Sequence, residues 1–337
     1  MVLRRGRMPV GLSGMRLAAT QRSGCINPMP PYIRAMKLPS IRALRRPFSA
    51  LAALLLAVPA TVQARQPITP KPAMWVLSDA DTTVYLFGTI HLLPKGVDWT
   101  GGKLDDALAK SDELIIETII DEKNPMQFMQ ALSSLSSSPN LPPLRERVSA
   151  DKRPALDAAV KASGLPAMVY DRMETWAAAF LLLGSKFRGI GLAPEDGVEI
   201  VLRKSFIEKG KPIEALETNA EQLGFFDRLP EDAQRSLLEG AISTDKDMKA
   251  EFTSMLDAWK TGDVEKIART FDKDLAETPA LRDALMVQRN RNWAKWIDGR
   301  MNQPGSVMIA VGAGHLAGSE SVQRHLEAKG YRVQRVQ

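Results

Sequence analysis

The chain has 337 residues and carries 45 Lys and Arg against 39 Asp and Glu, a formal net charge of +6. The first 64 residues hold ten of the basic residues and none of the acidic ones, which leaves 35 basic and 39 acidic side chains, a net charge of −4, for the rest of the chain. The excess of basic over acidic residues therefore lies entirely in residues 1–64, here called the leader. Because the rest of the chain lacks the net positive charge that binding to a phosphate backbone requires, nucleic acid is excluded as a partner.

Residues 1–64 have the three parts of a signal peptide for export. Three arginines at 42–46 precede an apolar run at 50–58, and small residues at the end of the leader predict cleavage near Ala64. The run is too short to cross a hydrocarbon core of about 30 Å as a helix, so we expect no stable transmembrane anchor. The sequence therefore predicts a periplasmic or secreted protein, released after cleavage of the signal peptide.

Two further features of the leader bear on its processing. Met36 and Lys37 match the start of a conventional signal, so translation is expected to begin at Met36. A mitochondrial transit peptide is the alternative for an Arg-rich leader without acidic residues, but the leader lacks the long Arg-rich amphipathic face of such peptides. Cys25 is the only cysteine, so the chain after cleavage would hold no disulfide, thiolate metal site or cysteine nucleophile.

Beyond the leader, the sequence predicts a Pro-rich spacer at 65–73 and a single domain at 74–337. Apolar and β-branched runs predict strands at Met74–Leu77, Val84–Gly88, Glu113–Ile120, Pro212–Leu216, Val307–Val311 and Tyr331–Val336. The first two strands are separated by turn-forming residues at 79–81 and are expected to form a hairpin.

The middle of the chain has the spacing of helices. They are predicted at 124–137, 151–163, 175–183, 196–209, 231–241, 245–260, 264–276 and 278–300. A further helix at 319–329 lies between the last two strands and gives a βαβ-like unit. We therefore expect a mixed α/β fold, with a central β-sheet built from the N- and C-terminal parts and a large helical insertion at about 121–300.

The pattern Gly-x-x-His occurs twice, each time directly after a predicted strand, at Gly88–His91 and Gly312–His315. Strand ends of open α/β sheets are where binding sites form, and imidazole is both the commonest metal ligand and a common general base. Because parallel neighbours bring such turns to one edge of a sheet, we expect His91 and His315 to lie close together. The third histidine, His325, has the surroundings of a solvated helix face.

Three further side chains are candidates for the same site. Glu117 interrupts the apolar run of its predicted strand, and a buried carboxylate is costly unless it is paired or binds a metal; strand alternation that turns it to water is the alternative. Glu217 follows a short predicted strand, and a place in the first turn of a helix is its alternative. Arg289 would bind an anion or stabilise negative charge if it faces the site, and otherwise lies on a solvated helix face.

Several familiar sites are excluded. The stretch at 312–317 matches the dinucleotide-binding fingerprint Gly-x-Gly-x-x-Ala between a strand and a helix. That site needs an acidic residue about 20 positions further on, where this chain has Arg-Val-Gln at 335–337. The sequence also contains no His-Glu-x-x-His helix and no Gly-x-Ser-x-Gly elbow, so a zincin site and a serine-hydrolase site are excluded as well.

With their spacing, these motifs resemble the TraB/GumN family, which includes the Tiki proteases. The end motifs of the resemblance are Trp75-x-x-Ser78, Val84-Tyr-Leu-Phe-Gly-Thr-Ile-His91-x-x-Pro94, Val311-Gly-Ala-Gly-His315-Leu-x-Gly318 and Gly330-Tyr331-x-Val333. Between them lie Glu117-Thr118, Gly197-Val198-Glu199, Leu216-Glu217-Thr218 and Arg289-Asn290. The resemblance covers nearly all of the chain after the leader, from about Trp75 to Val336.

The resemblance implies a mixed α/β core of the erythromycin-esterase-like and ChaN-like type, with a helical insertion. Its Tiki branch implies metal-dependent peptide hydrolysis that uses the two Gly-x-x-His motifs and a glutamate, which here are His91, His315 and Glu117. Glu199 stands where many relatives would have an aspartate.

The leading hypothesis is a periplasmic metal-dependent hydrolase, with a peptidase as one form of it. His91 and His315 would bind Mn²⁺, Co²⁺ or Zn²⁺ together with a carboxylate from Glu117 or Glu217, and the metal would activate a bound water. The second carboxylate would act as general base, and Arg289 would steady the oxyanion. The substrate would be a peptide or a small molecule that the sequence does not identify.

Two other functions stay open at this point. One is a metal-free, esterase-like hydrolase with a histidine as base and a glutamate that orients it. The other is a non-catalytic binding protein of envelope or exopolysaccharide systems. Metal content separates the metal-dependent hydrolase from the metal-free hydrolase. Turnover that is lost on replacing His91 separates both hydrolases from the non-catalytic binding protein.

Overall fold

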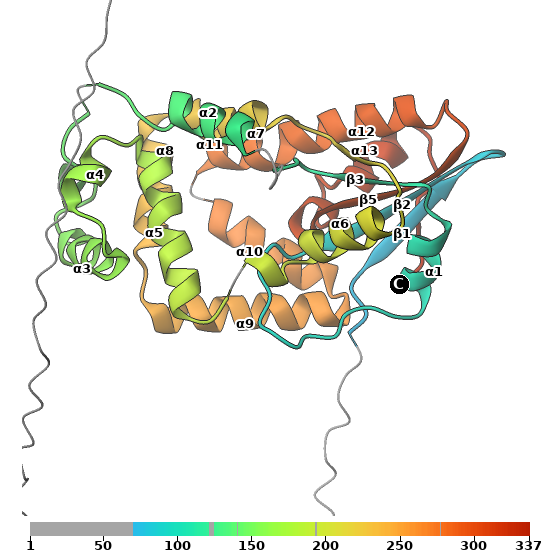
Figure 1. The fold of residues 1–337 in the computed structure, drawn as a ribbon, viewed down its shortest axis with the longest axis horizontal. Helices are drawn as coiled ribbons and strands as arrows, with labels where there is room; N and C mark the ends of the chain where they lie inside the picture. Colours follow the sequence, from blue (N-terminus) through green and yellow to red (C-terminus); the bar gives the residue numbers. More distant parts are fainter. Residues whose placement is uncertain (1–69, 121–124, 140, 193, 277) are drawn as a thin grey trace, which may run out of the picture. The chain divides into compact units, whose positions relative to one another are not determined.

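The computed structural model describes residues 70–120, 125–139, 141–192, 194–276 and 278–337. These residues belong to one compact unit, Ala64–Gln337. The expected signal peptide, its cleavage near Ala64 and the start at Met36 fall outside the described residues and stay predictions. No helix of the described residues is both long enough and apolar enough to span a membrane. The fold is mixed α/β, as the sequence predicts (Figure 1).

Six strands form one mixed sheet. They are β1 (Met74–Ser78), β2 (Thr82–Thr89), β3 (Glu113–Ile116), β4 (Ile213–Ala215), β5 (Gly305–Gly312) and β6 (Gln334–Arg335), in the order β4-β3-β5-β2-β1-β6. Neighbours among β4, β3, β5 and β2 are parallel, whereas β1 is antiparallel to both β2 and β6. The predicted hairpin of the first two strands is confirmed. The sheet joins N-terminal and C-terminal strands, and only β4 comes from the middle of the chain.

Three strands are shorter than the sequence predicts, and β4 lacks one predicted residue at each end. β3 ends at Ile116 and not at Ile120. Beyond it, the side chain of Glu117 accepts the backbone N–H of Gly312 at 2.7 Å, which takes the place of a further ladder bond. The last strand is confined to β6, and Tyr331 instead belongs to the end of the preceding helix, where its N–H donates to the carbonyl of Leu326.

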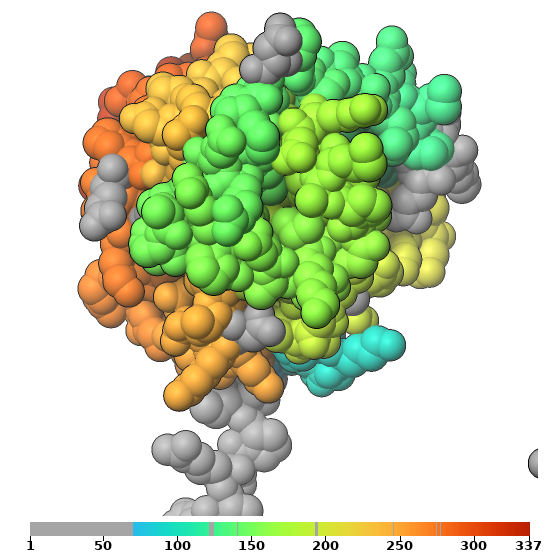
Figure 2. Space-filling view, turned by 90° about the vertical axis from the view of Figure 1, so that its left-hand side faces the viewer, coloured from blue at the N-terminus to red at the C-terminus, as the bar shows by residue number. Residues whose placement is uncertain are grey.

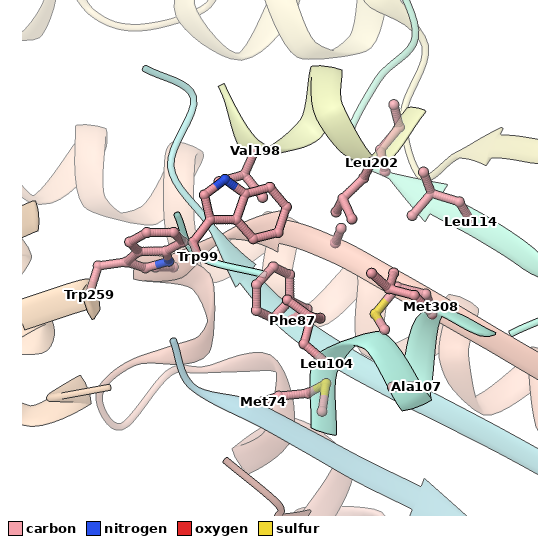
Figure 3. Packing of buried hydrophobic residues seen from close by; sticks show 14 of the residues in the cluster. Met74, Phe87, Trp99, Leu104, Ala107, Leu114, Val198, Leu202, Trp259 and Met308 are labelled. Carbon is pink, nitrogen blue, oxygen red and sulfur yellow. The ribbon is translucent and has the colours of Figure 1, made fainter. Parts of the chain in front are cut away.

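Both faces of the central strands are buried, as expected for parallel strands with apolar runs. Alternate side chains of β5 point to opposite faces, so that Ile309 packs against helices α12 (Gln288–Arg300) and α13 (Val322–Ala328). Met308 points to the other face, which α1 (Lys103–Lys110), α6 (Val198–Glu208), α9 (Asp245–Thr261) and α10 (Val264–Leu275) cover. Figure 3 shows Phe87 of β2 on this second face, with Trp99 and Trp259 around it.

The remaining helices are α2 (Met126–Leu135), α3 (Arg153–Ser163), α4 (Ala167–Asp171), α5 (Thr175–Gly189), α7 (Asn219–Asp227), α8 (Glu231–Ala241) and α11 (Pro279–Arg282). Shorter turns are η1 (Leu144–Glu146), η2 (Pro194–Asp196), η3 (Asp283–Val287) and η4 (Ala313–Leu316). Helices α3, α4, α5 and α8 pack around a core of their own, at the end remote from the sheet (Figure 1). Figure 2 views that end, where α3 and α5 lie side by side.

All of the predicted helices are present, with ends that differ by a few residues. The sequence prediction omitted α1, α4 and α7. The signal for α7 was present, because Thr218 and Glu221 form a capping box that satisfies the first N–H groups of the helix. The predicted helix at 278–300 is a continuous helical run, but η3 within it is a π-helical turn.

Candidate active site

Four of the predicted site residues follow the carboxyl ends of the four parallel strands, and the fifth, Arg289, lies on α12. His91 lies two residues after β2, Glu117 directly after β3, and Glu217 two residues after β4. His315 lies in η4, three residues after β5. Since parallel strands end at one edge of the sheet, residues far apart in the sequence meet there, which is where open α/β sheets form their sites.

The structure brings the two Gly-x-x-His motifs together at Gly312. A Cβ atom placed on Gly312 would lie 3.7 Å from His91 Nε2, 3.6 Å from His315 Cδ2 and 3.2 Å from Glu117 Oε1. Both imidazoles and one carboxylate therefore surround a single point, and the absence of a side chain at Gly312 keeps it open. The glycine of η4, Gly314, has no room for a side chain, since a Cβ would meet the ring of Phe271 at 2.6 Å.

His315 is buried and held in one orientation. Its Nδ1 lies 2.6 Å from Asn290 Oδ1, and the amide of Asn290 donates in turn to the carbonyl of Glu320. Because this second bond fixes the Asn290 oxygen toward the ring, Nδ1 carries the proton and Nε2 is the acceptor nitrogen. Burial, with Arg289 alongside, lowers the pKa of His315 to about 3, so the ring is neutral at physiological pH.

His91 is exposed, with 65% of its side chain accessible, and it pairs with a carboxylate. Its Nδ1 lies 2.7 Å from Glu199 Oε1, and the same oxygen accepts a hydrogen bond from the hydroxyl of Thr89. The nearby charge of Glu199 raises the pKa of His91, and the exposure of the ring lets water screen part of that effect. The pairing leaves Nε2 facing the shared point at Gly312.

Arg289 joins the two glutamates in a buried cluster. Its Nη2 donates to Glu117 Oε2 at 2.7 Å and to Glu217 Oε2 at 2.9 Å, and its Nε donates to Glu217 Oε1 at 2.9 Å. Its Nη1 lies 3.2 Å from His315 Nε2, and its guanidinium stacks over Trp293 at 4.7 Å. The N–H groups of Arg289 are thus engaged within the cluster. The role of Arg289 at an oxyanion stays a prediction, and it would require one of these N–H groups to leave its present partner.

The two carboxylates of this cluster differ in acidity. Burial acts to raise the pKa of Glu117, but its cationic neighbours, with Arg289 in direct contact, and the N–H of Gly312 hold that pKa well below its usual range. Burial raises the pKa of Glu217 despite the hydrogen bonds from Arg289. Glu117 is therefore the permanently charged partner of the guanidinium, and Glu217 is the member of the pair that is easier to protonate.

The π-helical turn η3 explains how Arg289 and Asn290 both reach the site. The turn ends at Val287, directly before α12, and both residues are buried, at 6% and 1% exposure. A π turn inserts an extra residue into a helix and is frequent at functional sites. Here it sets the start of α12 so that Arg289 faces the glutamates while Asn290 faces His315.

Sequence reasoning missed two residues of this site and left a third without a role. Asn290 and Trp293, whose indole N–H donates to Glu217 at 2.9 Å, were not proposed as site residues, although Asn290 stood in a quoted family motif. Glu199 stood in another such motif, and only the structure shows its pairing with His91. His325, by contrast, lies on α13, 3.4 Å from Glu320, and with 20% exposure it is more buried than a solvated helix face.

The fold and the site define the class of protein. It is a mixed α/β protein with two histidines and a Glu–Arg–Glu cluster at the carboxyl edge of its sheet. The chain belongs to the TraB/PrgY/gumN family, whose sequence profile matches residues 73–335. The resemblance seen in the motifs is thereby confirmed at the level of the family. Comparisons with curated proteins and with solved structures gave no match.

The donor set does not fit a metal ion in the arrangement described. A metal site needs at least three donors around one point. Among the residues that the structure describes, no group of three or more His, Cys, Asp or Glu side chains is arranged so that it could hold one ion, and this includes the His91, His315 and Glu117 side chains around Gly312. Arg289 also opposes a metal ion here, because its cationic guanidinium lies beside His315 Nε2 and occupies one oxygen of Glu117. A metal at His315 would require Arg289 to turn away.

Proposed function

We propose that this protein is a hydrolase in which His91 is the general base that activates a water molecule. The observation that carries the proposal is the pairing of His91 Nδ1 with Glu199, which leaves Nε2 open at the shared point with Glu117 and His315. A carboxylate on one nitrogen of an imidazole fixes its orientation and stabilises the charge that forms when the other nitrogen takes a proton. His91, Glu117 and Glu199 line a cavity of about 410 Å³, which gives a substrate access to His91.

The proposed reaction is the hydrolysis of an ester or amide. His91 Nε2 takes a proton from water, and the water oxygen adds to the carbonyl carbon of the substrate. The bond to the leaving group then breaks, and the leaving group receives the proton from His91. In this proposal Glu199 is a positioning residue that orients His91. Arg289 and Glu117 hold the neutral ring of His315 in place beside the reaction centre.

We also propose that the protein acts outside the cytoplasm, in the periplasm or after secretion, on a peptide or a small molecule. The leader sequence supports the location, since its arginines, apolar run and small residues near Ala64 are those of a signal peptide. The open, exposed position of His91 supports a substrate that arrives from solvent.

The role of Glu199 is tested by the pH dependence of hydrolysis in Glu199→Gln. A general base works when it is neutral, so the rate should rise with pH through the pKa of His91, which Glu199 raises. Removal of the carboxylate lowers that pKa toward the ordinary value of about 6.5, so the rising limb of kcat/KM should move to lower pH. A limb that stays in place, or moves to higher pH, would show that Glu199 does not act through His91.

A metal-dependent hydrolase is the second candidate, and one feature favours it. Each imidazole has its Nδ1 held by an acceptor, Glu199 for His91 and Asn290 for His315. The Nε2 of His91 lies at the point beside Gly312, and the Nε2 of His315 lies 3.9 Å from Glu117 Oε1, the carboxylate oxygen at that point. Metal-binding histidines usually have their second nitrogen held in this way. If Arg289 turned aside, the two Nε2 atoms and a carboxylate would be the donors, and the ion would supply a Lewis acid and an activated water.

Calorimetric titration with Mn²⁺, Co²⁺ and Zn²⁺ separates the two candidates. If the metal candidate is right, the wild-type protein binds one ion, His91→Gln loses this binding, and His325→Gln keeps it. Hydrolysis that persists in the presence of a chelator, together with no binding of the three ions, would rule this candidate out and leave the metal-free reaction.

A further inference from the structure

Aliphatic side chains form part of the lining of the cavity at the site. Besides His91 and Glu117, it is bordered by Ile116, Ile120 and Ile200. Ile116 and Ile120 come from the end of β3 and the residues after it, and Ile200 comes from the first turn of α6. Ile120 is 39% exposed, which leaves a large apolar side chain beside the reaction centre with no partner to cover it fully.

The polar side chains of the same cavity are already occupied. The hydroxyl of Thr118 donates to Asn219 Oδ1 at 2.9 Å, and the amide of Gln222 donates to Glu117 Oε2 at 3.3 Å. Arg203, which also borders the cavity, has an interaction partner as well. A ligand in this part of the cavity therefore contacts mainly isoleucine side chains. The favourable contribution to its binding free energy there comes from burial of its apolar surface against them.

From this lining we infer that the substrate carries an aliphatic group next to the carbonyl that is attacked, and that Ile116, Ile120 and Ile200 bind this group. The inference rests on the proposed hydrolysis at His91. A cavity of about 410 Å³ is near the lower end of the range of small-molecule sites, about 300–1,000 Å³, so it suits one acyl group or one side chain and not a longer polymer segment.

The test uses p-nitrophenyl acetate, butyrate and hexanoate with the wild-type protein. Each methylene that the isoleucines remove from water should raise kcat/KM by about fourfold, so butyrate should exceed acetate by on the order of tenfold. Equal kcat/KM for the three esters, or a preference for acetate, would overturn the inference.

Two isoleucines of α6 give a matched pair of variants. Ile200→Asn places a polar side chain in the cavity and should reduce the ratio of butyrate to acetate turnover to near one. Ile207→Asn makes the same change seven residues along the helix, at a position that is 59% exposed and does not border the cavity, and should keep the wild-type ratio. A ratio that falls equally in both variants would show that the effect is one of helix stability and would overturn the inference.

Binding of neutral amides separates this inference from the hydrolase proposal. Hexanamide and acetamide are titrated into protein labelled at its isoleucine methyl groups, and the Ile200 resonance is followed by NMR. Tighter binding of hexanamide at Ile200 without turnover of any ester would uphold the aliphatic site and contradict the hydrolase. Turnover without chain-length preference and without a shift of Ile200 would uphold the hydrolase and contradict the aliphatic site.

Discussion

Replacement of Arg289 by methionine is expected to lower the free energy of unfolding by about 3–5 kcal/mol, because the change leaves buried carboxylates without their counter-charge. Arg289 bridges Glu117 and Glu217, and all three side chains are at most 7% exposed. Methionine fills a similar volume but supplies none of the hydrogen bonds. Chemical denaturation at neutral pH measures the loss.

The pH dependence of this loss identifies its cause. Without Arg289 the two glutamates have raised pKa values in the folded state, so protonation at acidic pH stabilises the variant relative to neutral pH. The wild type behaves in the opposite way at Glu117, whose lowered pKa contributes stability that is lost as the pH falls below the ordinary range of a glutamate. The difference between the two proteins should therefore shrink as the pH is lowered.

Arg291→Met is the matched control, two residues further along the same helix. Arg291 is 62% exposed and lies 3.8 Å from Glu320, so its removal should change the free energy of unfolding by less than about 1 kcal/mol. A loss in Arg289→Met that is no larger than in this control, or that stays constant with pH, would show that the buried cluster does not depend on the guanidinium.

Replacement of His91 by glutamine is expected to lower kcat about 10²- to 10⁴-fold, which is the usual contribution of a general base. The protein should keep its stability, since the imidazole is 65% exposed and contributes little buried surface. Steady-state kinetics on an ester substrate measures the first effect, and thermal unfolding measures the second. Loss of activity with an unchanged unfolding midpoint would assign the defect to the reaction and not to folding.

His325→Gln controls for the substitution itself. His325 lies on α13 beside Glu320, outside the cavity at His91, so its replacement should leave turnover at the wild-type level. Full activity in His91→Gln would contradict the proposed base. If no ester or peptide substrate is turned over by the wild type, the non-catalytic binding protein becomes the better hypothesis.

The main elements of the fold could be predicted because their signals are local. The apolar runs at 84–88 and 307–311 predicted the two strands that form the centre of the sheet, and they are β2 and β5. Turn residues between the first two strands predicted the hairpin. The end of β3 could not be predicted in this way, because it depends on Glu117 accepting an N–H from Gly312, a residue distant in the sequence.

The positions of the site residues could also be expected from the sequence. His91 and His315 each follow a strand at a glycine-containing turn, and the parallel arrangement then brings them to one edge of the sheet. Their partners could not be predicted, because a hydrogen bond between side chains depends on which helix lies over which strand end. Glu199 reaches His91 from α6, and Asn290 reaches His315 from α12.

The sequence by itself determined the family, the mixed α/β class and the two histidine motifs, since periodicity and motif spacing are properties of neighbouring residues. Only the tertiary structure decided what surrounds the histidines. The strand order places Glu117 and Glu217 side by side, and the π-helical turn η3 brings Arg289 between them. The cation at the centre of the site follows from this packing of distant segments, which no local pattern of residues specifies.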